Sequence, residues 1–312
     1  LGGRGAGERD GRTLRRNAVV IVPVSSDPDP ATESDASDDR DSATSHDAAP
    51  DRDPATDNDS ATADGDEATL PINELFASLQ GEGRLAGVPS AFVRTSGCNL
   101  RCWFCDSYHT SWEPTHAEMT VEEVLAEVAS FDVDHVVVTG GEPLLHDAVE
   151  DLLAGLDERG YHATVETNGT VYRDAPIDLA SVSPKLASST PAPETDPTPD
   201  DAPVDASDWA DRHEERRVDL DALVALVENY EFQLKFVVGE RGDVTEVRDL
   251  LARIREAAAV EVRDTDVLLM PEGATRDRLA ETRPVAADLA REYGFRYTPR
   301  LHVTLWNDAP ET

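Results

Sequence analysis

All three cysteines of this 312-residue chain lie in one short segment, Gly97-Cys98-Asn99-Leu100-Arg101-Cys102-Trp103-Phe104-Cys105-Asp106. Their spacing is Cys-x3-Cys-x2-Cys, and an aromatic residue precedes the last of them. A cubic iron–sulfur cluster takes four ligands, so three thiolates would leave one iron open to another group. The segment therefore suggests a catalytic cluster rather than a simple electron carrier.

A structural zinc ion is the alternative for these thiols. His109 would complete the pattern Cys-x3-Cys-x2-Cys-x3-His, which is an acceptable tetrahedral ligand set. The cysteine spacing and Phe104 favour a loop wrapped around a cube, and a zinc knuckle needs no large surrounding domain. A non-enzymatic zinc-binding interaction module stays open as the alternative.

Around the cysteines, short apolar segments alternate with longer amphipathic ones. This alternation predicts an α/β fold with a parallel sheet and right-handed crossovers. About six such units fit an incomplete (β/α)6-type barrel better than a complete eight-stranded one, and the chemistry of such barrels gathers at the carboxyl ends of the strands. Thr120 and Glu123 form a capping box at the start of one helix. The predicted strands are residues 91–95, 135–139, 162–166, 177–183, 232–238, 266–270 and 301–305, and the predicted helices are 120–131, 148–159, 220–229, 244–258 and 276–293.

Two stretches lack the large apolar residues of a core. Residues 1–68 are rich in Asp, Ala, Ser, Thr and Pro, and we expect a disordered acidic tail because too little surface can be buried to offset the ordering entropy. Residues 188–217 have a similar composition, but the strand–helix alternation resumes after them. They are predicted to be an acidic surface insertion within a single partial-barrel domain, residues 69–312.

The chain is strongly acidic, with 64 Asp and Glu against 28 Lys and Arg and a formal net charge of −36. Such a surface repels nucleic acids and anionic membranes, so we expect neither as a partner. An acidic, lysine-poor composition is typical of proteins selected for high salt, and we expect a halophilic source. Only Lys185 and Lys235 remain beside 26 arginines, which suggests that an ammonium group is needed at each position.

The cysteine usage and the hydropathy indicate where the protein works. Three clustered cysteines cannot build a disulfide framework, which indicates a reducing compartment. No apolar run approaches the roughly 20 residues that span a bilayer. Arg15 and Arg16 faintly resemble a twin-arginine signal, but the apolar stretch after them is short. We therefore expect a cytoplasmic protein.

Polar motifs follow three of the predicted strands. They are Thr139-Gly140-Gly141-Glu142-Pro143, Glu166-Thr167-Asn168-Gly169 and Ser183-Pro184-Lys185. Consecutive glycines allow close backbone approach to a ligand, and a neighbouring carboxylate can hold an ammonium group. Each motif alone would also serve as an ordinary turn or strand exit.

Further candidates lie before the cysteines, directly after them and near the C-terminus. Gln80 and Glu82 offer donors and acceptors suited to the edge of a heterocycle, and Arg94 could fork a carboxylate, although a polar turn and an ordinary strand arginine would look the same. Asp106 and Ser107 could ligate Mg2+ or cap a turn. His302 and Lys235 are the remaining candidate site residues. His302 could also be a core histidine, and Lys235 could also face solvent on an edge strand.

Taken together, these motifs resemble the radical S-adenosylmethionine superfamily, and within it the 7-carboxy-7-deazaguanine synthases. The resemblance covers residues 71–306 without the insertion. It implies that Cys98, Cys102 and Cys105 hold a [4Fe–4S] cluster whose open iron binds S-adenosylmethionine. The implied cofactor-binding residues also include Phe104, Asp106, Gly141, Glu142, Glu166, Ser183, Pro184 and Lys185; the implied substrate-binding residues are Leu79, Gln80, Gly81, Glu82, Arg94, Thr139 and His302.

The resemblance also implies a reaction. Reductive cleavage of S-adenosylmethionine gives a 5′-deoxyadenosyl radical, which abstracts hydrogen from C6 of 6-carboxy-5,6,7,8-tetrahydropterin, and the ring contracts with loss of ammonia. Ser107 would ligate a Mg2+ that also touches the substrate carboxylate; the family usually has Thr there, and Ser keeps the hydroxyl. The implied partners are an electron donor, flavodoxin or ferredoxin, and a second copy of the chain in a homodimer.

A different radical enzyme with the same cysteine loop, such as a glycyl-radical activase, is the closest alternative. An activase would need a groove for a protein substrate and has no reason to place a heterocycle-reading turn at Gln80 and Glu82. These residues, with Arg94, favour the small-molecule substrate.

Overall fold

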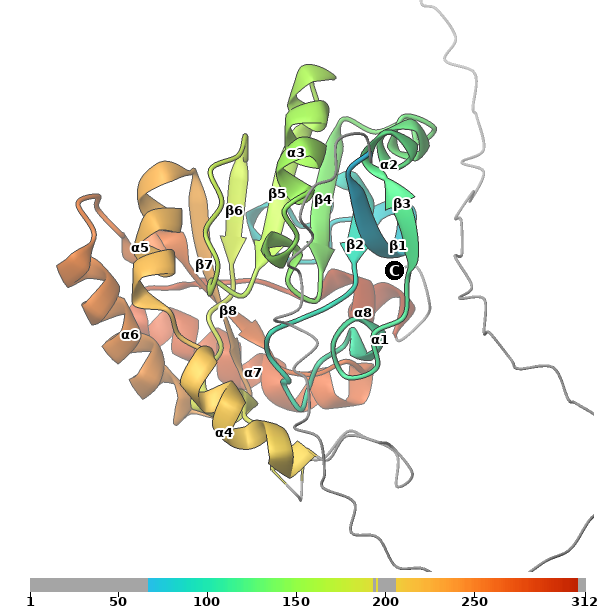
Figure 1. Cartoon of the computed structure of the whole chain (residues 1–312). Helices are drawn as coiled ribbons and strands as arrows, with labels where there is room; N and C mark the ends of the chain where they lie inside the picture. Colours follow the sequence, from blue (N-terminus) through green and yellow to red (C-terminus); the bar gives the residue numbers. More distant parts are fainter. Residues whose placement is uncertain (1–66, 193–194, 196–205, 308–312) are drawn as a thin grey trace, which may run out of the picture.

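The structure, a computed structural model, describes residues 67–192, 195 and 206–307 (Figure 1). The predicted tail, residues 1–68, lies outside the described residues except for its last two. Part of the predicted insertion, residues 188–217, also lies outside them. Among the described helices, none is both long and apolar enough to cross a membrane.

One sheet organises the described part of the chain, with the strand order β3-β1-β2-β4-β5-β6-β7-β8-β9. Strand β2 and strands β4 to β9 run parallel, whereas β1 and β3 are antiparallel at one edge. The parallel series confirms the predicted partial barrel. The strands are β1 Thr69–Leu79, β2 Pro89–Thr95, β3 Ala117–Thr120, β4 His135–Gly140, β5 His162–Thr167, β6 Leu179–Val182, β7 Phe232–Val238, β8 Val267–Pro271 and β9 Arg296–Tyr297.

Helices cover the outer face of this sheet (Figure 1). Helix α3 contacts β5, α5 contacts β6, α6 contacts β7 and α7 contacts β8. The predicted capping box is confirmed, since the Thr120 hydroxyl accepts from Glu123 N at 3.2 Å and the Glu123 carboxylate accepts from Thr120 N at 2.8 Å. The helices are α1 Tyr108–Ser111, α2 Val121–Val128, α3 Val149–Glu158, α4 Ala206–Arg216, α5 Leu220–Asn229, α6 Asp243–Ala257, α7 Arg276–Tyr293 and α8 Leu301–Trp306.

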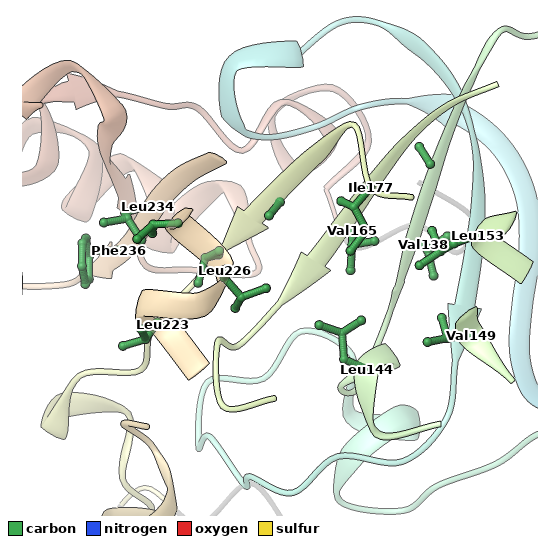
Figure 2. Packing of buried hydrophobic residues seen from close by; sticks show 14 of the residues in the cluster. Val138, Leu144, Val149, Leu153, Val165, Ile177, Leu223, Leu226, Leu234 and Phe236 are labelled. Atoms are coloured by element: carbon green, nitrogen blue, oxygen red, sulfur yellow. The ribbon is translucent and has the colours of Figure 1, made fainter. Parts of the chain in front are cut away.

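The main core lies between the sheet and these helices. Figure 2 shows Val138 and Val165 of the sheet beside Leu153 of α3, and Leu234 beside Leu226 of α5. Burying a side chain of this size stabilises the fold by roughly 2 kcal/mol. The opposite face of the sheet carries a separate small cluster, Phe76, Phe92 and Val137, in which the two rings stack at 5.0 Å.

The predicted last strand, residues 301–305, is wrong: this segment is helix α8. Alternating Leu301, Val303 and Leu305 matches a strand pattern, but in the helix Val303 is buried while Leu305 is 44% exposed. Leu301 N donates to Gly81 O, and the Arg276 side chain donates to Leu305 O, so tertiary contacts satisfy both ends of the helix.

Strands β1, β3 and β9 and helices α1 and α4 were not predicted from the sequence. A register shift between Ile72 and Glu74 interrupts the alternation of β1 and obscures its apolar pattern. Helix α4 lies inside the segment predicted to be an acidic insertion, and its polar composition gave little helix signal.

Candidate active site

A cavity of about 340 Å³ opens at the carboxyl ends of the parallel strands. Of the cofactor-, substrate- and metal-binding residues that the family resemblance implies, all line it except Glu142 and Pro184. The structure thus brings together residues from both ends of the described chain. The proposed residues that line the cavity are Leu79, Gln80, Gly81, Glu82, Arg94, Cys98, Cys102, Phe104, Cys105, Asp106, Ser107, Thr139, Gly141, Glu166, Ser183, Lys185 and His302.

The three thiols occupy one wall of this cavity. Burial raises the pKa of Cys98 and of Cys102 to about 12, so without a metal both are neutral thiols. Cys98 Sγ accepts from Leu100 N at 3.4 Å, and Cys105 Sγ accepts from the Ser111 hydroxyl at 3.2 Å. Soft sulfur donors with hydrogen bonds to the sulfurs suit an iron–sulfur cluster.

The spacing of the sulfurs distinguishes a cluster from zinc. Among the described residues, the one set of three His, Cys, Asp or Glu ligand atoms within 4.8 Å of one another is Glu82, Asp106 and His302, so the three sulfurs are not that close together. Zn–S bonds of about 2.3 Å would bring the sulfurs within about 4 Å of each other. His109 is exposed and does not line the cavity. The arrangement fits a larger cluster better than the zinc site that the sequence left open.

Gly140 and Gly141 pack the end of β4 against the cysteine loop. A Cβ on Gly141 would lie 2.2 Å from Gly97 O and 2.8 Å from Cys98 Cβ. Gly140 has a φ of 147°, a conformation that favours glycine. The close approach expected of these glycines is therefore made to protein, by Gly140 to Thr95 at the end of β2 and by Gly141 to the cysteine loop, and both glycines line the cavity.

Glu142 lies in the protein wall rather than at the cavity surface. Its carboxylate accepts from Thr167 Oγ1 at 2.9 Å, Asn168 N at 2.6 Å and Leu144 N at 3.1 Å. Burial raises its pKa to about 7, opposed by these hydrogen bonds. The structure places Glu142 as a brace between the ends of β4 and β5, not as the group facing an ammonium that the sequence suggested.

Lys235 lies between two carboxylates at the other end of the cavity. Its Nζ is 2.6 Å from Glu82 Oε2 and 2.8 Å from Glu166 Oε2. The side chain is 3% exposed on an interior strand, so the alternative of a solvent-facing charge on an edge strand is wrong. Although burial opposes ionisation, the two carboxylates raise the pKa of Lys235 above its usual range.

Glu82 is the centre of this network. Arg300 Nε donates to Glu82 Oε1 at 3.1 Å, and the same guanidinium pairs with Asp106. Burial raises the pKa of Glu82, but Lys235 and Arg300 outweigh it and hold the carboxyl pKa well below its ordinary value. The Gln80 side chain accepts from Glu82 N and donates to Glu166, which fixes the turn.

His302 reaches the same group from helix α8. Its Nε2 is 4.0 Å from Glu82 Oε1, and burial lowers the pKa of the ring to about 4, with Glu82 opposing. A neutral imidazole can both donate and accept a hydrogen bond. Arg300 was not predicted as a site residue, although it lies two residues before His302. Lys235 could be predicted because lysine is rare in this chain.

Arg94 and Ser107 lie on the side nearest the cysteines. Arg94 Nε contacts Glu74 Oε2 at 2.7 Å, and Arg94 donates to the Ser107 hydroxyl at 2.9 Å. That hydroxyl is 3.3 Å from Asp106 Oδ1, so two hard oxygen donors meet at the cavity surface. The pair fits the partial ligand set that Mg2+ takes from proteins, the remaining positions being filled by water or substrate.

The Ser183-Pro184-Lys185 motif closes the opposite wall. Ser183 N donates to Thr167 O at 2.8 Å, and Lys185 Nζ donates to the Ser183 hydroxyl at 2.9 Å. Lys185 also lies close enough to Cys102 to act on its ionisation. Ser183 and Lys185 face the cavity, whereas Pro184 does not.

Comparison with known proteins agrees with this geometry. The Radical SAM superfamily model matches residues 92–185. A 7-carboxy-7-deazaguanine synthase from Halobacterium salinarum is 63% identical over 253 residues, covering 81% of this chain and 96% of the relative. One from Rhodopirellula baltica is 39% identical over 249 residues, with coverages of 78% and 91%.

A solved structure supports the same relationship. The crystal structure of QueE from Escherichia coli is 26% identical with a TM-score of 0.54, covering 75% of this chain and 95% of that one. The chain is therefore a radical S-adenosylmethionine enzyme that belongs to the 7-carboxy-7-deazaguanine synthase family.

Proposed function

We propose that this enzyme converts 6-carboxy-5,6,7,8-tetrahydropterin into 7-carboxy-7-deazaguanine, contracting the ring and releasing ammonia in 7-deazapurine biosynthesis. The observation that carries the proposal is a cavity of about 340 Å³ that is lined both by three thiols and by a Glu82–Lys235–Glu166 network. Its size suits small molecules rather than a protein segment. The named relatives support the same reaction.

The cofactors would be held at the thiol wall. Cys98, Cys102 and Cys105 would ligate a [4Fe–4S] cluster, and Gly141, Ser183 and Lys185 would contact S-adenosylmethionine. When bound, these cofactors would supply the radical that removes hydrogen from C6 of the substrate, chemistry that no side chain provides. The protein itself binds, orients and excludes water.

The pterin would bind at the carboxylate end. Each Glu82 oxygen already accepts from one cation, Lys235 or Arg300, and each retains a lone pair for an N–H group of the heterocycle. Because Glu82 stays ionised, it is an acceptor throughout the reaction. His302, as a neutral ring on α8, would complete this side of the pocket.

The substrate carboxylate would lie near Arg94 and Mg2+. Arg94 would exchange part of its contact with Glu74 for the substrate, since a guanidinium can fork a carboxylate. Ser107 and Asp106 would supply oxygen ligands to the ion. In the Glu82–Asp106–His302 group both Glu82 oxygens face cations, whereas Arg300 pairs with Asp106 Oδ2 and leaves Asp106 Oδ1 beside the Ser107 hydroxyl. The predicted flavodoxin or ferredoxin donor, the homodimer and the cytoplasmic location stay predictions.

The test is an anaerobic reconstitution with iron and sulfide in high salt. Reductant, S-adenosylmethionine, Mg2+ and 6-carboxytetrahydropterin are added, and the products are analysed by mass. We expect 5′-deoxyadenosine together with 7-carboxy-7-deazaguanine. 5′-Deoxyadenosine alone would discard the substrate and favour another radical enzyme, such as a glycyl-radical activase. Neither product from protein with a full cluster would contradict the proposed function.

A further inference from the structure

Helix α4 contributes two buried side chains to the neighbourhood of the cysteine loop. Trp209 is 6% exposed and His213 is fully buried, although the helix lies in the segment expected to be a surface insertion. Trp209 packs against Trp112 in a small cluster that also includes Cys105. In Figure 1 the helix lies below α5. Its buried face is thus directed at the loop that carries the thiols.

His213 makes a specific hydrogen bond to this loop. Its Nδ1 lies 3.1 Å from Arg101 N, and Nε2 lies 2.9 Å from the Ser189 hydroxyl. Because a backbone amide can only donate, Nδ1 must be the acceptor, and the neutral ring therefore carries its proton on Nε2. The Ser189 hydroxyl accepts the hydrogen bond from Nε2–H and donates its own to Leu186 O at 2.6 Å. Every polar atom of the ring has a partner in one directed chain.

The predicted insertion, residues 188–217, also contacts Trp103, which follows Cys102 in the cysteine loop. Trp103 N donates to Ser189 O at 3.2 Å, and the Trp103 indole donates to Ser188 O at 2.7 Å. The Arg101 guanidinium lies 4.2 Å from the centre of the Trp209 ring. Arg101 and Trp103, the two chain neighbours of Cys102, are thus both held by residues of the segment 188–217.

The loop has little structure of its own to hold these positions. Between the end of β2 at Thr95 and the start of α1 at Tyr108, the structure has no helix or strand. Fixing an irregular backbone costs about 1–2 kcal/mol per residue, which outside contacts must offset. Groups that orient the ligands of a metal site affect its affinity by about 10- to 100-fold even without touching the metal.

We propose that His213 is a positioning residue that holds the Cys98–Cys102 turn through the Arg101 amide, so that helix α4 is part of the cluster site. The inference rests on the proposed [4Fe–4S] cluster, since its purpose is to keep the thiols arranged for that group. Trp209 covers the turn from the outside. The segment is therefore a clamp on the cysteine loop rather than a dispensable insertion.

The experiment compares full-length variants of the reconstituted enzyme under anaerobic conditions in high salt. Iron release to an excess of chelator is followed by absorbance for the wild type, His213→Asn, His213→Gln and His213→Ala. The Asn oxygen can take the place of Nδ1 and accept from Arg101 N, whereas the Gln side chain reaches toward the Nε2 position. Glu215→Gln, on the exposed side of the same helix, is the matched control. Backbone amide exchange of the peptide covering residues 98–105 is measured in parallel on cluster-free protein.

We expect iron release to be about 10-fold or more faster in His213→Ala and His213→Gln, with His213→Asn closer to the wild type. Amide exchange in residues 98–105 should be faster in the same order, and Glu215→Gln should match the wild type in both. Equal release and exchange in all variants would overturn the inference, while product formation by the wild type would leave the proposed function standing. A wild type that loads no four-iron cluster would count against the proposed function, and the exchange data would still decide whether His213 holds the loop.

Discussion

Lys235 Nζ donates to Glu82 Oε2 at 2.6 Å, joining strand β7 to the turn after β1 across 153 residues of sequence. Glu166 on β5 accepts from the same ammonium at 2.8 Å. One buried cation thus pairs with two carboxylates from separate parts of the chain at the cavity wall. In a chain with two lysines, this pairing explains why one of them is at position 235.

Replacing Lys235 with Met should destabilise the fold strongly. It would take the buried ammonium away from the half-buried Glu166 carboxylate and leave Glu82 paired with Arg300, and breaking a buried pair in this way costs about 3–5 kcal/mol. Urea unfolding of the variant and the wild type measures the difference. Arg291→Met removes an exposed pair with Asp288 and should cost less than about 1 kcal/mol. If both substitutions lowered the free energy of unfolding by a similar, small amount, the buried network would contribute little to stability.

Replacing Gly141 with Ala should disturb the cysteine loop. The new Cβ would lie 2.2 Å from Gly97 O, so the loop must move. We expect at least about 10-fold lower cluster affinity, measured as iron retained after gel filtration against chelator. Gly242→Ala, at an exposed position where the nearest atom is the end of the Glu240 side chain, is the control. Full iron retention in Gly141→Ala would contradict the close packing described here.

Ser107 should determine the response to magnesium. Ser107→Ala removes one hard oxygen from the cavity surface and leaves the thiols in place, so the cluster should form while stimulation of turnover by Mg2+ falls about 10-fold or more. Ser107→Thr keeps the hydroxyl and should keep a saturable response to the ion. Turnover is titrated with Mg2+ after chelation. An unchanged response in Ser107→Ala would remove this residue as a ligand.

The stability of the protein should fall between pH 6.5 and 4 in part through His135. This ring is 4% exposed between Ser90 Oγ at 2.6 Å and Thr164 Oγ1 at 2.8 Å, and burial, with His162 nearby, lowers its pKa to about 4. In the unfolded chain this imidazole takes up a proton near pH 6.5, whereas in the folded protein it does so only near pH 4. Between these two pH values protonation therefore favours the unfolded state and lowers the free energy of unfolding, and above pH 6.5 this loss is absent.

The His135→Asn variant isolates this contribution. Its free energy of unfolding should depend less on pH between 4 and 6.5 than that of the wild type. Cluster-free protein in high salt is unfolded with urea at several pH values to compare the two slopes. Identical slopes would mean that His135 is not held neutral by the fold.

Much of the fold and of the site could be predicted because the signals are local. Strand β7 and helices α5 and α7 have the predicted bounds. The cysteine loop and the motifs at the strand ends meet at one cavity because parallel strands place their carboxyl ends at the same edge.

The remainder depends on tertiary contacts that leave little trace in the sequence. Glu142 belongs to a motif that the sequence treats as cofactor-binding, but hydrogen bonds from Thr167 and Asn168 turn its carboxylate into the wall. The pairing of Lys235 with Glu82 joins distant segments, and no local pattern marks it. Trp209 and His213 are four residues apart in a polar helix, a spacing that places both on one face and was the available signal for the packing of α4.

Deuterium on C6 of 6-carboxytetrahydropterin would show whether the thiol wall and the carboxylate end of the cavity act on the same molecule. The labelled substrate is incubated anaerobically with reconstituted enzyme, reductant, S-adenosylmethionine and Mg2+, and both products are analysed by mass. The account predicts deuterium in 5′-deoxyadenosine together with 7-carboxy-7-deazaguanine. Unlabelled 5′-deoxyadenosine, formed at the same rate with or without the pterin, would contradict it.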